Sequence, residues 1–243
     1  MHDTVIRNGT VYDGTGRRGF IADVAIDRGR VSAVGEIRDK AREEIDATGL
    51  MVCPGFVDVH THYDGQVTWE NRTSPSAGHG VTTVVMGNCG VGFAPCRPAD
   101  RERLVHLMEG IEDIPEIVMT EGIPWTWETY PEYLDVIGAK SRDIDVASQL
   151  PHSCIRVYAM GERALRGEAA RPHDLEVMKR LSETAMRAGA VGFGTSRTLF
   201  HKSSDGTQVP TKTAHEEELV AIAEGMRAAG HGVMQAIIDL LDE

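Results

Sequence analysis

Long apolar runs, an excess of basic residues and closely spaced cysteines are all missing from this sequence of 243 residues. No stretch of about 18 apolar residues occurs, so we expect no transmembrane helix. The first nine residues lack the basic and apolar regions of a secretory signal. Lysine and arginine number 25 against 37 carboxylates, and the net charge of −12 argues against nucleic acid or an anionic membrane as a partner.

The cysteines are few and scattered, at Cys53, Cys89, Cys96 and Cys154. No C-x-x-C pair is present, and disulfide frameworks belong to short secreted chains with many cysteines. We therefore expect reduced thiols and a cytoplasmic protein.

Two kinds of pattern divide the chain, and we expect a domain of residues 1–50 followed by a domain of residues 51–243. In the first part, short apolar segments flank turn signals at Asn8-Gly9 and at Asp27-Arg28-Gly29-Arg30. Such signals are typical of β-hairpins. The first domain is therefore predicted to be a small antiparallel β unit.

From Met51 onward, apolar strands alternate with amphipathic helices. The predicted strands are 52–62, 81–87, 144–150, 191–195 and 233–238, and the predicted helices lie within 98–110, 130–139, 173–189 and 215–230. This alternation indicates an α/β fold in which helices cover a parallel sheet. About five βα units are present, which corresponds to a partial (β/α)₈ TIM barrel.

One long segment departs from this alternation. Residues 109–135 contain eight carboxylates and neither lysine nor arginine, together with Trp125 and Trp127. Loops of this length are often functional lids, although a solvated acidic surface loop is an equally good interpretation. We expect residues 91–127 to cover the mouth of the barrel as its second βα loop.

The most specific motif is Pro54-Gly55-Phe56-Val57-Asp58-Val59-His60-Thr61-His62. Because side chains alternate along a strand, His60 and His62 point the same way, about 6–7 Å apart, and can converge on one metal ion. A lone histidine on an apolar strand is more often a core residue. Two histidines that follow such a strand start are better explained as metal ligands.

A second motif, Gly87-Asn88-Cys89-Gly90, follows the next predicted strand. If the two strands are neighbours, their axes lie about 5 Å apart and Cys89 reaches the same metal. A free cysteine is usually a small buried hydrophobic residue. Beside His60 and His62 we favour a thiolate ligand, which selects zinc over magnesium or calcium.

These motifs resemble the amidohydrolase superfamily, and the Gly-Asn-Cys-Gly corner resembles its D-aminoacylase group, the N-acyl-D-amino-acid deacylases. Further matches are Pro131-Glu132-Tyr133-Leu134-Asp135, His152-Ser153-Cys154-Ile155-Arg156 before Met160-Gly161, and Gly192-Phe193-Gly194-Thr195-Ser196. The resemblance implies a (β/α)₈ barrel with a β-sandwich built from both chain ends, of which residues 1–50 are one half. It also implies one or two zinc ions on His60, His62 and Cys89, and a small-molecule N-acyl-D-amino acid as substrate.

The sequence departs from the family's pattern near its end. The family has histidine ligands on its fifth and sixth strands, and residues 233–239 contain no histidine. Its general-base aspartate is expected beyond residue 243. We therefore expect this chain alone to be an inactive deacylase, either associating as a homo-oligomer or completed by barrel strands from another polypeptide.

Two other functions remain open at this point. One is a hydantoinase-like cyclic amide hydrolase, although that group carries a carboxylated lysine where this chain has Thr195-Ser196. The other is a metal-binding scaffold without catalysis.

Two residues are candidates for substrate contacts. His152 is expected to open a loop on the active face, and a solvated loop histidine is an equally good interpretation. Arg197 follows the fourth barrel strand and could hold a substrate carboxylate with two hydrogen bonds, although an ordinary surface arginine is the commoner case.

Overall fold

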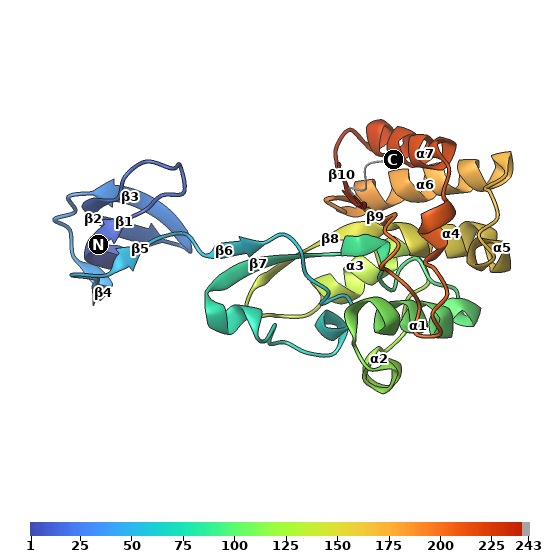
Figure 1. The fold of residues 1–243 in the computed structure, drawn as a ribbon. Helices are drawn as coiled ribbons and strands as arrows, with labels where there is room; N and C mark the ends of the chain where they lie inside the picture. Colours follow the sequence, from blue (N-terminus) through green and yellow to red (C-terminus); the bar gives the residue numbers. More distant parts are fainter. Residues whose placement is uncertain (240–243) are drawn as a thin grey trace. The chain divides into compact units, whose positions relative to one another are not determined.

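The computed structural model describes residues 1–239 (Figure 1). The chain divides after Phe56 into two compact units. This boundary lies a few residues beyond the one predicted near residue 50, because the two-residue strand at Met51–Val52 still pairs with the first strand of the chain.

The first unit is a five-stranded sheet in the order β3-β2-β1-β4, with β5 also paired to β1. Its strands are β1 (His2–Val11), β2 (Phe20–Asp27), β3 (Arg30–Gly35), β4 (Ala41–Asp46) and β5 (Met51–Val52). The pairs β1–β2 and β2–β3 are antiparallel, as predicted, and β4 and β5 add parallel to β1. Val11, Ala22 and Val24 form its small core.

The two turn predictions in this unit have different outcomes. Arg28 and Gly29 both have positive φ, 52° and 72°, so the predicted turn between β2 and β3 is confirmed. The predicted hairpin at Asn8-Gly9 is wrong, because β1 runs through it. Asn8 has a φ of 59° and its amide donates to the Asp23 carboxylate at 2.9 Å, which makes a β-bulge within one strand.

The second unit is built on a curled sheet in the order β10-β9-β8-β7-β6. Its strands are β6 (Phe56–Asp58), β7 (Val81–Met86), β8 (Asp145–Pro151), β9 (Gly192–Ser196) and β10 (Val233–Ile237). The pairs β7–β8, β8–β9 and β9–β10 are parallel. The predicted α/β fold with a partial (β/α)₈ barrel is confirmed.

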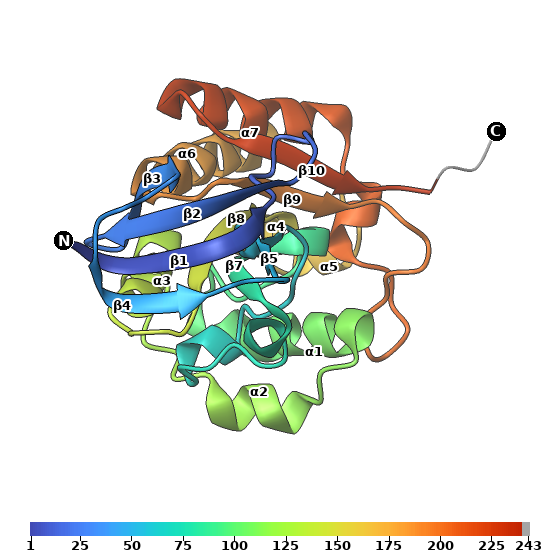
Figure 2. The same ribbon diagram turned by 90° about the vertical axis from the view of Figure 1, so that its left-hand side faces the viewer.

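Helices follow the strands of this unit. They are α1 (Arg101–Glu112), α2 (Glu116–Gly122), α3 (Tyr130–Gly138), α4 (His152–Met160), α5 (Glu162–Leu165), α6 (Pro172–Ala188) and α7 (Glu216–Ala229), with 3₁₀ turns η1 (Gln66–Thr68), η2 (Ser76–His79), η3 (Asn88–Gly90), η4 (Pro98–Asp100) and η5 (Pro210–Thr213). Figures 1 and 2 show α6 and α7 packed side by side next to β9 and β10.

Helix α4 is absent from the sequence prediction, which placed a loop at its start. Its residues from His152 to Val157 are all buried. A helix that is buried all round carries no amphipathic period, and this explains why the pattern gave no signal there.

The acidic segment is ordered and belongs to the core. It begins with the last turn of α1, contains α2, and buries Met119, Ile123 and Trp127. These residues belong to the main hydrophobic cluster of the second unit. A detached, solvated loop is therefore excluded for this part of the segment.

Among residues 1–239, no helix has the length and apolar character needed to cross a membrane. All four cysteines are free, with Cys53 exposed and the others buried.

The corner after β7 is closely packed against the neighbouring strands. Gly87 has a φ of 81°, and a Cβ there would lie 2.1 Å from the Gln149 carbonyl oxygen on β8. Gly90 has a φ of 71°, and a Cβ there would lie 3.0 Å from the Thr195 Cα on β9. Glycine satisfies both the left-handed conformation and the close backbone approach.

We predict that Gly87→Ala lowers the free energy of unfolding by at least about 1–2 kcal/mol, the usual cost of a left-handed residue with a Cβ. The Gln149 carbonyl is backbone and cannot move aside as a flexible side chain would. Urea titration followed by circular dichroism measures the change.

The matched control is Gly138→Ala, at the end of α3, where no heavy atom lies within 4 Å of the added Cβ and φ is ordinary. This control should stay within about 0.5 kcal/mol of the parent. Equal stability of the two variants would contradict the packing argument.

Candidate metal centre

His60 and His62 lie just beyond β6 and not within a strand. The predicted strand 52–62 is interrupted at Pro54-Gly55, and β6 ends at Asp58. Thr61, between the two histidines, still pairs with β7, since its amide donates to the Val85 carbonyl at 3.0 Å. This pairing keeps both imidazoles at the C-terminal end of the strands.

Cys89 is placed beside them by the turn η3. It has a φ of 54°, which is uncommon for a residue with a side chain. The buried Asn88 fixes the turn, because its Nδ2 donates to the Thr61 carbonyl at 3.2 Å and to the Val85 carbonyl at 2.8 Å. The same asparagine therefore joins the cysteine turn to the segment that carries both histidines.

The three side chains converge as predicted. The Cys89 Sγ lies 3.2 Å from the His60 Nε2 and 3.6 Å from the His62 Nε2, and the three donor atoms all lie within 4.8 Å of one another. Ligands of a tetrahedral zinc ion stand roughly 3.3–3.8 Å apart, given zinc–nitrogen and zinc–sulfur bonds of about 2.0–2.3 Å. The geometry fits a metal, while the role of these residues as ligands stays a prediction.

Burial controls the ionisation of this group. It lowers the pKa of His62 to about 4, with a smaller contribution from the charge of His60, so the His62 imidazole is neutral. It raises the pKa of Cys89 to about 12, and the nearby Glu112 carboxylate adds to the shift. A cation that binds here meets neutral imidazole nitrogen and must displace the thiol proton.

The donor set also fits zinc chemically. Zinc prefers imidazole nitrogen and thiolate sulfur as ligands, whereas magnesium and calcium prefer oxygen. The buried Nδ1 of His62 has no hydrogen-bond partner among the described residues.

Sequence reasoning missed two residues that reach this group. The Glu112 Oε1, at the end of α1, lies 3.2 Å from the His62 Nε2. The Gln235 Nε2, on β10, lies 3.4 Å from the His60 Nδ1. Glu112 was one of the eight carboxylates of the acidic segment, and Gln235 lies on the strand where the family's histidine was sought.

A third missed residue is His201, in the loop after β9. Its Nδ1 lies 2.8 Å from the Oγ of Ser196, the last residue of β9. Burial lowers the pKa of His201, and the charge of His60 lowers it further. His201 therefore belongs to the same electrostatic environment as the metal-binding candidates.

The expectation that His152 opens a loop and contacts substrate is not supported. His152 begins α4, and its side chain is fully buried. One ring nitrogen lies 2.7 Å from the Thr195 Oγ1 and the other 2.8 Å from the Glu218 carboxylate. Both nitrogens are occupied, so the residue joins α4, β9 and α7 inside the protein.

Arg197 is exposed directly after β9. Its backbone amide donates to the Ile237 carbonyl at 2.8 Å, which holds the position against the end of β10. Its proposed contact with a substrate carboxylate stays a prediction.

A family model and individual related proteins point to the same group of proteins. Residues 43–242 match the model of the Amidohydrolase family. A D-aminoacylase from Alcaligenes xylosoxydans xylosoxydans is 31% identical over 229 residues, which are 94% of this chain and 43% of that protein.

Solved structures agree. A D-aminoacylase structure described as having a binuclear metal centre has a TM-score of 0.76 and 30% identity, over 96% of this chain and 44% of that one. The N-acyl-D-glutamate deacylase from Bordetella bronchiseptica, solved with zinc and a phosphonate inhibitor, has a TM-score of 0.73 and 28% identity, over 97% of this chain and 44% of that one. The chain thus spans less than half the length of these relatives. The matched family model covers most of the sequence, and the chain belongs to the amidohydrolase family.

Proposed function

We propose that this chain is part of a zinc-dependent N-acyl-D-amino-acid deacylase. The observation that carries the proposal is the convergence of His60, His62 and Cys89 within 4.8 Å at the C-terminal end of the barrel strands. Active sites of barrel enzymes lie at this end. Membership of a family of amide-bond hydrolases supports the reaction class.

The relatives support the substrate class. Proteins named D-aminoacylase, N-acyl-D-aspartate deacylase and N-acyl-D-glutamate deacylase match between 79% and 94% of this chain. They share an N-acyl-D-amino acid substrate and differ in its side chain. We therefore propose a small N-acyl-D-amino acid as substrate.

Zinc fits the donor set, as one or two ions held by His60, His62 and Cys89. When bound, zinc polarises an amide carbonyl and lowers the pKa of water towards 7. The protein supplies the placement: Thr61 and Asn88 hold the two histidines and the cysteine at fixed distances. Arg197 is our candidate for holding the substrate carboxylate.

A hydantoinase-like activity is less well supported. The end of the fourth barrel strand carries the buried Thr195 and Ser196, and their hydroxyls contact His152 and His201. A carboxylated lysine, the bridging ligand of that group, has no counterpart at these two positions.

We predict that Cys89→Ala lowers the zinc content of the purified protein to well below one ion per chain. The thiolate is the only anionic member of the three converging side chains, so its loss removes the charge that best holds a divalent ion. Metal analysis of the protein after dialysis against limiting zinc measures the content.

The control for this variant is Cys53→Ala, because Cys53 is a free and exposed cysteine in the other unit. Its zinc content should equal that of the parent. Unchanged zinc in the Cys89 variant would contradict the proposed centre.

The substrate class is tested by turnover. With a complete barrel, we expect zinc-dependent release of the free amino acid from N-acetyl-D-amino acids and none from the L-enantiomers. For the 243-residue chain alone we expect zinc binding with turnover at least about 10²-fold lower, the usual contribution of a general base.

Chromatographic separation of the product on a chiral column gives the readout. Ring opening of hydantoins in place of deacylation would favour the hydantoinase-like function. Stoichiometric zinc with no turnover of either class by the complete barrel would favour a scaffold without catalysis.

A further inference from the structure

Glu112 is a carboxylate that the proposed chemistry leaves without a role. It is the last residue of α1, its side chain is only 18% exposed, and its Oε1 lies 3.2 Å from the His62 Nε2. We propose that Glu112 is a fourth metal ligand, which joins His60, His62 and Cys89 around the ion. This inference rests on the proposed metal centre and adds a residue to it.

The charge of the Glu112 carboxylate is not balanced by any lysine or arginine within residues 1–239. The nearly buried carboxylates Asp174 and Glu218 each face an arginine, at 2.7 Å and 3.4 Å. Within residues 1–239, Glu112 has no lysine or arginine partner, and the one basic group beside it is the His62 imidazole. A carboxylate withdrawn from water is either protonated or balanced by a cation, and a divalent metal ion at this position would supply that cation.

The packing of α1 orients Glu112 towards the metal-binding side chains. Val105, Met108 and Glu112 are spaced by three and four residues, so they lie on one side of the helix. Val105 and Met108 are buried in the main hydrophobic core. The helix is thus held with Glu112 facing inward, towards the histidines.

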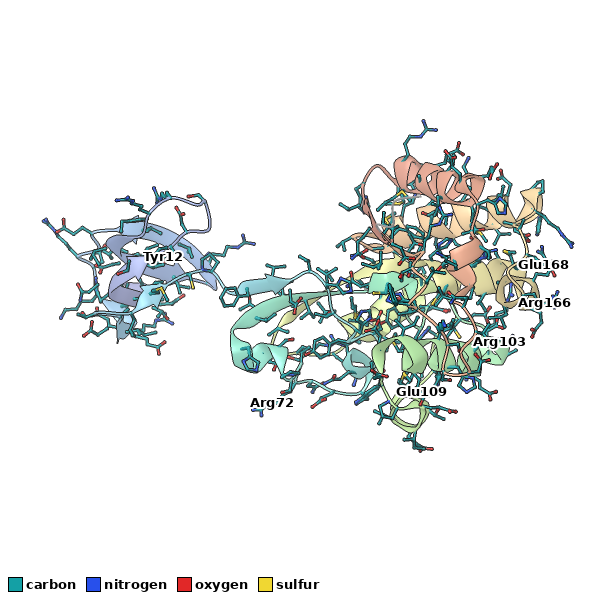
Figure 3. The ribbon with its side chains drawn as sticks, in the orientation of Figure 1. Tyr12, Arg72, Arg103, Glu109, Arg166 and Glu168 are labelled. Carbon is teal, nitrogen blue, oxygen red and sulfur yellow. The ribbon has the colours of Figure 1, made fainter. Side chains whose placement is uncertain are left out.

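Glu112 differs in this respect from its neighbour one turn earlier. Figure 3 labels Glu109 on α1, and its Oε1 accepts a hydrogen bond from the Glu116 backbone amide at 3.0 Å. The Glu109 carboxylate already has a partner at the start of α2. The Glu112 carboxylate faces the metal-binding side chains.

The donor set is also better balanced with Glu112. Two neutral imidazoles and one thiolate leave a divalent ion with a net charge of +1. For a single ion held by these four side chains, the Glu112 carboxylate brings the total to zero, which favours a partly buried site. Its Oε1 lies 3.2 Å from the His62 Nε2, close to the spacing of two ligands around one zinc ion.

The test compares Glu112→Gln with Glu102→Gln in the full chain. Both remove one negative charge from α1, and Glu102 is exposed on the opposite side of the helix from the core. Zinc affinity is measured by competition with a chromophoric chelator. Cobalt(II) is then used as a spectroscopic probe, because its visible bands report the number and type of ligands.

For Glu112→Gln we expect zinc affinity to fall by at least about tenfold, the lower range seen when groups around a metal are removed. We also expect the cobalt bands to change in position and intensity, while the sulfur-to-cobalt band persists because Cys89 remains. Glu112→Asp keeps a carboxylate on a shorter side chain. Its zinc affinity and cobalt bands should lie between those of the parent and those of Glu112→Gln. Glu102→Gln should match the parent in both measurements.

Parental affinity and parental cobalt bands in Glu112→Gln would overturn this inference. The Cys89→Ala variant separates that result from a failure of the centre itself. If Cys89→Ala loses metal while Glu112→Gln does not, Glu112 is no ligand and the three-residue centre stands. If neither variant loses metal, the centre and this inference both fail. A circular dichroism spectrum of each variant confirms that it is folded.

Discussion

The close approach of backbone at Gly87 is the constraint on which the candidate site depends. The chain leaves β7 through a left-handed residue packed against the Gln149 carbonyl of β8, and a Cβ at Gly194 on β9 would lie 2.4 Å from the Gly87 carbonyl oxygen. Only residues without a Cβ permit three strand ends to meet this closely. The turn that results places Cys89 above the strand ends, where both histidines also lie.

Much of the second unit could be predicted from sequence because its strands and helices carry strong periodic signals. The strands β7 to β10 fall within a residue or two of their predicted ranges. Prediction failed where a tertiary contact decided the structure. At Asn8-Gly9 the Asp23 carboxylate accepts the Asn8 amide and stabilises a bulge in place of a turn, and at α4 complete burial removed the amphipathic pattern.

The same distinction between local sequence signals and tertiary contacts applies to the site. His60, His62 and Cys89 could be predicted because each lies next to a strand end, and parallel strands bring their ends together. Glu112 and Gln235 could not, since each is far from the histidines in sequence. Gln235 reaches His60 through the register of β10 beside β9, and Glu112 reaches His62 through the direction in which α1 packs. Neither the register of β10 nor the packing direction of α1 can be predicted from the local sequence.

The acidic segment links packing to chemistry. Helix α1, whose last turn begins this segment, buries Leu104 and Met108 in the core, and this burial fixes the end of the helix that carries Glu112. An ion bound to Glu112 and to the histidines would therefore connect α1 to the strand ends directly. Because a ligand that binds only the folded state stabilises it in proportion to the logarithm of its concentration, such an ion would stabilise the helix and the strand ends as one unit. The folding of this segment and the assembly of the site would then depend on each other.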